Sequence, residues 1–186
     1  FDTIVAFNAS FVETLVELHS FSARPLNQSL RGQGTQTTRS LTSYDHPIIQ
    51  AYIQALDSPI QQYLTEIGED QAHPTSARNQ GDYRFAGMWS VRLRGRGFHE
   101  SHVHPEGWIS SAYYVAVPPG TESSPDQAGW IGFGAPPYRV PSEGSELKWI
   151  EPKAGRVVLF PSFMWHGTKP IQDAAERITA PFDLIP

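Results

Sequence analysis

The stretch Ser101–Val117, SHVHPEGWISSAYYVAV, joins two histidines to a run of β-forming residues. Side chains two positions apart point to the same face of an extended strand, so His102 and His104 can face one metal ion. The run that follows, Trp108–Val117, is rich in aromatic and β-branched residues and predicts a strand. The stretch therefore predicts a metal site where the chain enters a β-sheet.

Short β-type runs, separated by glycine and proline, continue on both sides of this strand. Strands that follow one another without intervening helices favour antiparallel pairing into a sandwich or jelly roll. We therefore expect a mainly β fold with flanking helices. The expected strands are Phe85–Arg94, Trp108–Val117, Trp130–Phe133, Leu147–Ile150, Arg156–Phe160 and Arg177–Leu184.

The N-terminal part of the chain has helical spacing instead. Ser10-Phe11-Val12-Glu13 matches a capping box and predicts a helix of about three turns that starts there. Residues 20–44 lack a clear period and predict a loop with one short strand. From Asp45 to Gly68, apolar residues keep a 3-and-4 spacing, and Asp57-Ser58-Pro59 predicts a kink or two successive helices.

Length and composition fit one domain of 186 residues, with helical support in residues 1–80 and a jelly-roll core in residues 83–186. A formal charge of −5 with 14 Lys and Arg gives no basic stripe for nucleic acid. Arg92, Arg94 and Arg96 alternate, as one face of a strand does. No apolar run approaches the ~20 residues that span a bilayer, and no leader pattern is present, so we expect a cytoplasmic protein with no membrane contact.

A third histidine, His166, follows the expected strand Arg156–Phe160 and could complete a metal site. The chain has 0 Cys, so its metal ligands must be nitrogen or oxygen atoms. Non-haem iron oxygenases use two histidines and a carboxylate. Here His104 stands where the carboxylate is usual. Glu106 could supply it instead, but Pro105 redirects the chain, so we prefer the three histidines.

The remaining histidines have other expected places. His99 is expected behind the metal ligands or on the surface, while His19, His46 and His73 are expected to be structural. Trp89, Trp108, Phe163 and Trp165 are expected mainly in the core. The polar segment Pro118–Gly129 is read either as a lid or as a hairpin tip.

Arg177 has a planar, permanently charged fork that can grip a carboxylate with two hydrogen bonds. Thr179 shares its strand face, so its hydroxyl can contact the same group. The alternative is an ordinary solvent-facing strand. Of Tyr113 and Tyr114, only one can point inward, and we expect Tyr114 to do so. A 2-oxo acid bound beside the metal would provide the carboxylate.

These residues together resemble the 2-oxoglutarate and Fe(II)-dependent oxygenases of bacteria and phages, a family related to prolyl hydroxylases. The motifs that carry the resemblance are Asn27–Gly32, His102–Pro105, Ser110–Val115, Pro152–Ser162, His166-Gly167 and Glu176–Ile178. The resemblance implies a double-stranded β-helix, a cupin-like jelly-roll barrel. It also implies Fe(II) held by His102, His104 and His166, and 2-oxoglutarate anchored by Arg177 and Tyr114.

The activity implied is hydroxylation of a C–H bond by dioxygen, with decarboxylation of 2-oxoglutarate to succinate. The substrate is a small molecule or a peptidyl residue, and a homodimer is left open. Two alternatives stay open as well. One is a cupin-type metalloprotein with three histidine ligands, and the other is a jelly roll that binds metal or sugar without catalysis.

Overall fold

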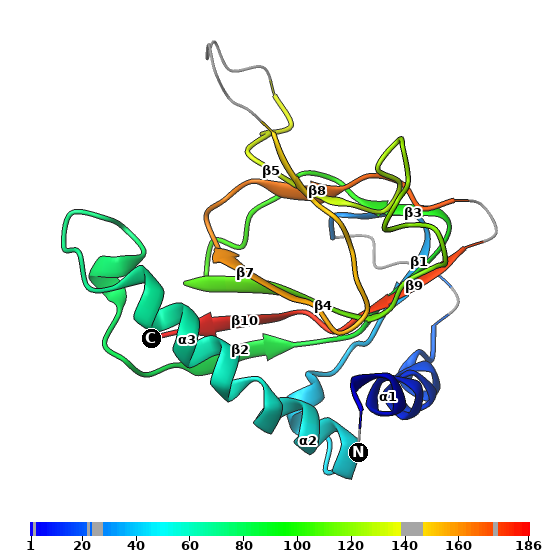
Figure 1. Ribbon diagram of the computed structural model, residues 1–186, viewed down its shortest axis with the longest axis horizontal. Coiled ribbons are helices and arrows are strands. Elements are labelled where there is room, and N and C mark those ends of the chain that lie inside the picture. Colours follow the sequence, from blue (N-terminus) through cyan, green and yellow to red (C-terminus); the bar gives the residue numbers. More distant parts are fainter. Residues whose placement is uncertain (2, 22, 24–27, 139–146, 173–174) are drawn as a thin grey trace.

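A computed structural model describes residues 1, 3–21, 23, 28–138, 147–172 and 175–186. Asn27, part of one resembling motif, lies outside these residues. Two antiparallel sheets face each other and form a curled, jelly-roll barrel (Figure 1). The fold is thus the mainly β double-stranded β-helix that the sequence predicts.

The larger sheet has the strand order β1-β3-β9-β4-β10-β2, and β7 pairs with β4 beside this path. Its strands are β1 (Leu30–Gln36), β2 (Arg84–Met88), β3 (Val91–His99), β4 (Ile109–Ala116), β7 (Val157–Pro161), β9 (Glu176–Thr179) and β10 (Phe182–Ile185). The smaller sheet has the order β6-β5-β8. Its strands are β5 (Ile131–Phe133), β6 (Lys148–Ile150) and β8 (His166–Thr168).

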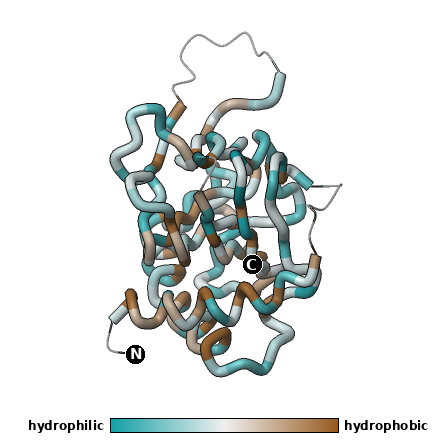
Figure 2. The backbone as a smooth tube through the Cα atoms, turned by 90° about the vertical axis from the view of Figure 1, so that its right-hand side faces the viewer, coloured by the Kyte–Doolittle hydropathy of each residue, from teal (hydrophilic) through white to brown (hydrophobic). Residues whose placement is uncertain are grey.

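The helices cover the outer face of the larger sheet, on the side away from β5 and β8 (Figure 1). They are α1 (Ile4–Leu18), α2 (Pro47–Ala55) and α3 (Asp57–Ile67), and short 3-10 turns span Leu41–Ser43 and Ser76–Arg78. Phe11 and Leu15 of α1 are fully buried and pack in one apolar cluster with Tyr52 of α2. Hydrophobic and hydrophilic residues are interspersed along the backbone (Figure 2).

Neighbouring side chains of strand β4 point to opposite faces of the larger sheet. Tyr113 joins the apolar cluster under the helices, and its hydroxyl donates to Asn8 Oδ1 at 2.7 Å. Tyr114, its neighbour, lines a cavity between the two sheets instead. The alternation of strand side chains therefore separates a helix-covered core from an inner face that can hold a site.

Several predicted boundaries are corrected by the structure. Helix α1 begins at Ile4 rather than Ser10, because Thr3 Oγ1 accepts the Ala6 N–H at 3.1 Å and caps the helix earlier. Ser10 lies inside the helix. The predicted break at Asp57–Pro59 is confirmed, since α2 and α3 meet there.

Two predicted strands are each divided in two. The run Phe85–Arg94 becomes β2 and β3, and the run Arg177–Leu184 becomes β9 and β10. Pro181 explains the second break, because it has no N–H for the ladder, and its carbonyl accepts the Trp89 N–H at the first break at 3.1 Å. Both strand pairs therefore bend at the same level of the barrel.

His19 links the end of α1 to the larger sheet, as its predicted structural role requires. Its Nδ1 lies 2.7 Å from Thr35 Oγ1 and its Nε2 lies 3.0 Å from Ser90 Oγ. Burial, with a smaller contribution from Arg92 and Arg94, lowers the pKa of His19 from 6.5 to about 4. His19 is therefore protonated at a higher pH in the unfolded chain than in the folded chain.

The stabilising contribution of neutral His19 is complete above pH 6.5 and is lost as the pH falls toward 4. We expect His19→Gln to flatten the acid loss of unfolding free energy in this range by at most about 1.4 kcal/mol per pH unit. Urea unfolding at pH 7 and at pH 4.5, compared with the wild type, measures this. An equal acid loss in both proteins would contradict the assignment.

No helix among the described residues is both apolar and long enough to pass through a membrane.

Candidate metal centre

Three histidines from two separate segments meet between the sheets. His102 and His104 lie in the segment that joins β3 to β4, and His166 begins β8. The backbones of His102 and His166 exchange two N–H···O bonds of 2.9 and 3.0 Å, which fixes the two segments side by side. The ring centroid of His102 lies 4.2 Å from that of His166 and 5.1 Å from that of His104. One ligand atom from each ring lies within 4.8 Å of the others.

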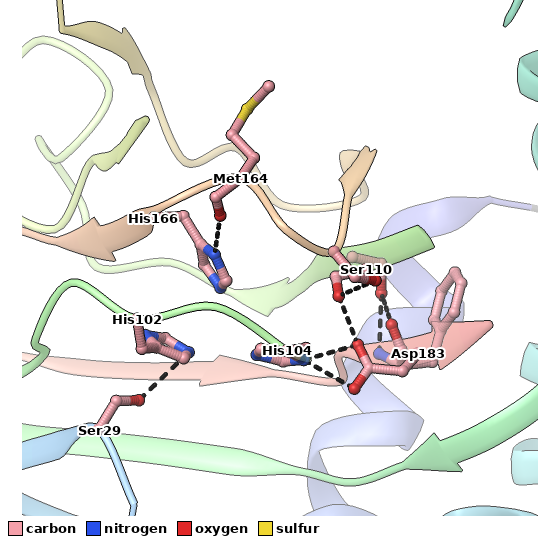
Figure 3. A network of polar contacts seen from close by, with 10 residues as sticks. Ser29, His102, His104, Ser110, Met164, His166 and Asp183 are labelled. Carbon is pink, nitrogen blue, oxygen red and sulfur yellow. Dashed lines mark hydrogen bonds and ion pairs between the residues drawn. The ribbon is translucent and has the colours of Figure 1, made fainter. Parts of the chain in front are cut away.

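The Nδ1 atom of each ring faces an oxygen acceptor, which sets the tautomer of all three histidines. His102 Nδ1 lies 2.7 Å from the Glu100 carbonyl, and His166 Nδ1 lies 3.0 Å from the Met164 carbonyl. His104 Nδ1 lies 2.7 Å from both carboxylate oxygens of Asp183 (Figure 3). With Nδ1 as the donor, each ring has its lone pair on Nε2, the nitrogen that is left to bind a metal.

Burial keeps two of these rings neutral. It lowers the pKa of His102 to about 4 and, together with repulsion from His102, the pKa of His166 to about 3. Metal ligation requires a neutral imidazole. These two ligands are therefore available at neutral pH without displacement of a proton.

Glycine at position 167 allows β8 to approach the ligand-bearing segment closely. A Cβ atom there would lie 2.9 Å from the His99 carbonyl oxygen and 3.0 Å from the Ser101 nitrogen. Any side chain would push β8 away from residues 99–101. The His-Gly pair 166–167 therefore combines a ligand with the close contact that positions it.

A cavity of about 660 Å³ extends from the three rings into the barrel. Arg177, on β9, lines it and is 2% exposed. One guanidinium nitrogen, Nη1, donates to the Gly129 carbonyl at 2.6 Å, whereas the buried Nε has no hydrogen-bond partner. A buried cation that lines a cavity is a site for an anion.

The other residues predicted for co-substrate binding lie beside Arg177. Tyr114 and Thr179 both line the cavity and are buried. The Arg177 Cζ atom lies 5.8 Å from the centre of the Tyr114 ring. Burial raises the pKa of Tyr114 although Arg177 opposes the shift, so the phenol keeps its proton and can donate a hydrogen bond.

Two residues that contact the three histidines were not among the predicted site residues. They are Ser29 and Asp183. The Ser29 hydroxyl lies 2.9 Å from His99 Nδ1 and 3.3 Å from His102 Nε2. His99 is half-buried and lines the same cavity as the three histidines. Ser29 stands beside the resembling segment Asn27–Gly32, but nothing in that segment signals a contact with histidine.

Other expected residues lie elsewhere. Glu106 is exposed and is not part of the three-histidine cluster. Phe163 is 54% exposed, so its placement in the core is wrong, and Trp89 lines the cavity, with its ring 6.1 Å from that of His104. The segment Pro118–Gly129 packs against the barrel through buried Thr121 and Ser124, and its last residue contacts Arg177.

The donor set fits Fe(II), and the cavity fits a small dianion. Three imidazoles that can each offer Nε2 as a donor atom suit a first-row divalent metal such as iron. The unpartnered Nε of Arg177 suits a carboxylate, as 2-oxoglutarate would provide.

Comparison with known proteins agrees with this geometry. Residues 87–183 match the model of the family described as "Putative 2OG-Fe(II) oxygenase". No curated protein is similar enough in sequence to count as a match.

Solved structures share the fold at low sequence identity. A prolyl-4-hydroxylase from Pseudomonas putida is 17% identical, with a TM-score of 0.58 over 98% of this chain and 85% of its own. A prolyl hydroxylase from Trichoplax adhaerens is 17% identical, with a TM-score of 0.62 over 98% of this chain and 78% of its own. HygX from Streptomyces hygroscopicus, with nickel and 2-oxoglutarate bound, is 12% identical, with a TM-score of 0.59 over 98% of this chain and 79% of its own. The matched residues 87–183 include all three histidines and Arg177, and the chain belongs to the 2-oxoglutarate and Fe(II)-dependent oxygenase family.

Proposed function

We propose that His102, His104 and His166 bind Fe(II) and that Arg177 anchors 2-oxoglutarate in a hydroxylase of this family. One observation carries the proposal: the cavity that the three rings line also holds a buried guanidinium with an unpartnered Nε–H. A dianion bound between the metal and Arg177 would offset two of the three positive charges that Fe(II) and the guanidinium bring into the buried site.

Three side chains, those of Arg177, Tyr114 and Thr179, would bind the co-substrate together. Arg177 would hold the carboxylate farther from the metal through two parallel N–H···O bonds. The Tyr114 phenol and the Thr179 hydroxyl would donate to the same group. When bound, Fe(II) and 2-oxoglutarate supply the oxidising chemistry that places one atom of dioxygen in a substrate C–H bond and releases succinate and carbon dioxide. The protein's own residues bind, orient and exclude water.

The rest of the cavity would hold the substrate. Its volume of about 660 Å³ lies in the usual range for small-molecule sites, and Trp89 stands over His104 at its wall. The structural neighbours include complexes with a peptide fragment and with hygromycin B. We therefore propose a peptidyl or small-molecule substrate.

The two alternative functions explain the site less well. A cupin-type metalloprotein or a jelly roll that binds metal alone would need no carboxylate anchor. In either case the buried charge of Arg177, with one hydrogen bond, would lower the stability of the fold and would bind no ligand.

Product analysis tests the proposed activity. The protein, Fe(II), 2-oxoglutarate and dioxygen are incubated with fractions of small metabolites and of peptides. We expect succinate in an amount equal to a product that is heavier than its substrate by one oxygen atom. Succinate that forms without Fe(II), or a fraction oxidised without consumption of 2-oxoglutarate, would contradict the proposal.

A further inference from the structure

His104 differs from the other two histidines in what lies behind it. The Nδ1 atoms of His102 and His166 face backbone carbonyls, whereas His104 Nδ1 faces the carboxylate of Asp183, with both oxygens at 2.7 Å. Asp183 lies on β10, on the far side of His104 from the other two rings (Figure 3). It is therefore placed to act on the metal through His104 and not as a ligand itself.

The carboxylate is held in place by its own contacts. Ser110 Oγ donates to Asp183 Oδ1 at 2.7 Å, and Ser110 and Ser162 hydroxyls lie 2.8 Å apart. The Asp183 backbone is paired with Ser110 on one side and Gly87 on the other. Aspartate is disfavoured inside strands, so its presence here, 15% exposed, needs another reason than sheet stability.

Charge supplies that reason. A two-histidine, one-carboxylate site places one negative charge on the metal, and a three-histidine site places none. A carboxylate that accepts the Nδ1–H of a ligand histidine makes its Nε2 a stronger donor. We propose that Asp183 is a positioning residue that restores, through His104, the negative charge that a direct carboxylate ligand would supply to the iron.

This inference rests on the proposed metal site and extends it. It explains how imidazole at position 104 is compatible with an oxygenase. It also predicts an electronic effect that a purely structural contact would not have. Loss of the charge would make the iron poorer in electrons, so a charge-transfer transition from Fe(II) to bound 2-oxoglutarate would need more energy.

The test compares Asp183→Asn with the wild type under anaerobic conditions. Asparagine keeps an oxygen acceptor for the Nδ1–H of His104 but removes the charge. We expect Fe(II) alone, measured by competition with a chromophoric chelator, to bind about 10–100-fold more weakly. With 2-oxoglutarate added, we expect the visible band to move to a shorter wavelength.

Two controls and a second variant make the result specific. Ser110→Ala removes one hydrogen bond to Asp183 and keeps the charge, so we expect a loss of no more than about fivefold and an unmoved band. Asp45→Asn removes an exposed charge before α2 and should change neither. If Asp183→Asn is too unstable to study, Asp183→Ser replaces it, since serine also offers a neutral acceptor.

The possible outcomes separate this inference from the proposed function. A wild-type protein that does not bind Fe(II) would refute the metal site itself. If the wild type binds Fe(II), an Asp183 variant that binds it no more weakly than Ser110→Ala, or whose band stays in place, would overturn the role of Asp183 alone. Weaker binding together with a moved band supports it.

Discussion

Replacement of Arg177 by methionine is expected to abolish 2-oxoglutarate binding and to leave Fe(II) binding in place. Methionine fills much of the same volume, so the change removes the charge and its donors more than the packing. Loss of one partner from a buried ion pair costs about 3–5 kcal/mol, which corresponds to a loss of affinity on the order of a hundredfold or more. Isothermal titration of the metal-loaded protein with 2-oxoglutarate measures it.

Thermal unfolding gives a second readout for the same variant. A ligand that binds the native state raises the unfolding midpoint, so 2-oxoglutarate should raise it in the wild type and not in Arg177→Met. Arg92→Met is the matched control, because Arg92 lies on the adjacent strand β3 and pairs with Glu176 at 2.7 Å. We expect it to weaken 2-oxoglutarate binding by less than about fivefold. Equal loss of metal and co-substrate binding in Arg177→Met would contradict the anchor role.

His166→Ala is expected to remove metal binding. Its Nε2 is one of the three donors, and the loss of a ligand should exceed the 10–100-fold effect that is typical for loss of a partner behind a ligand. We therefore expect Fe(II) affinity to fall by more than about a hundredfold. Competition with a chelator, as for Asp183, measures it.

The control for this variant must separate metal loss from loss of fold. The His166 ring packs 4.6 Å from the Phe160 ring, so alanine also leaves a cavity and lowers stability. Unfolding of the metal-free proteins measures that cost separately. His46→Ala changes an exposed histidine outside the site and should bind Fe(II) normally. A folded His166→Ala protein with wild-type Fe(II) affinity would show that His166 is not a ligand.

Local rules predicted the parts of the fold and of the site that depend on neighbouring residues. The two-residue period of extended chain placed His102 and His104 on one side. It also allowed only one of Tyr113 and Tyr114 to face inward, and Tyr114 is the one that lines the cavity. The same rules anticipated that a second helix starts at Asp57-Ser58-Pro59, where α3 begins. Each of these needs only the geometry of one element.

The parts that the sequence did not reveal depend on contacts between distant segments. Asp183 is 79 residues from His104 and reaches it only because β10 pairs with β4. Strand β8 has three residues, too few to show a period. The capping box at Ser10 gave a wrong start for α1 because an equally good cap, Thr3, stands before it. A local pattern cannot decide between two such caps.

Anaerobic addition of Fe(II) and then 2-oxoglutarate to the wild-type protein, followed by visible absorption, tests the central claim most directly. The three imidazoles and Arg177 share one cavity, so we expect one Fe(II) per chain and a weak visible band that develops only when both components are present. A protein that binds 2-oxoglutarate equally well with and without Fe(II), and shows no band, would contradict the claim that metal and co-substrate meet in this cavity.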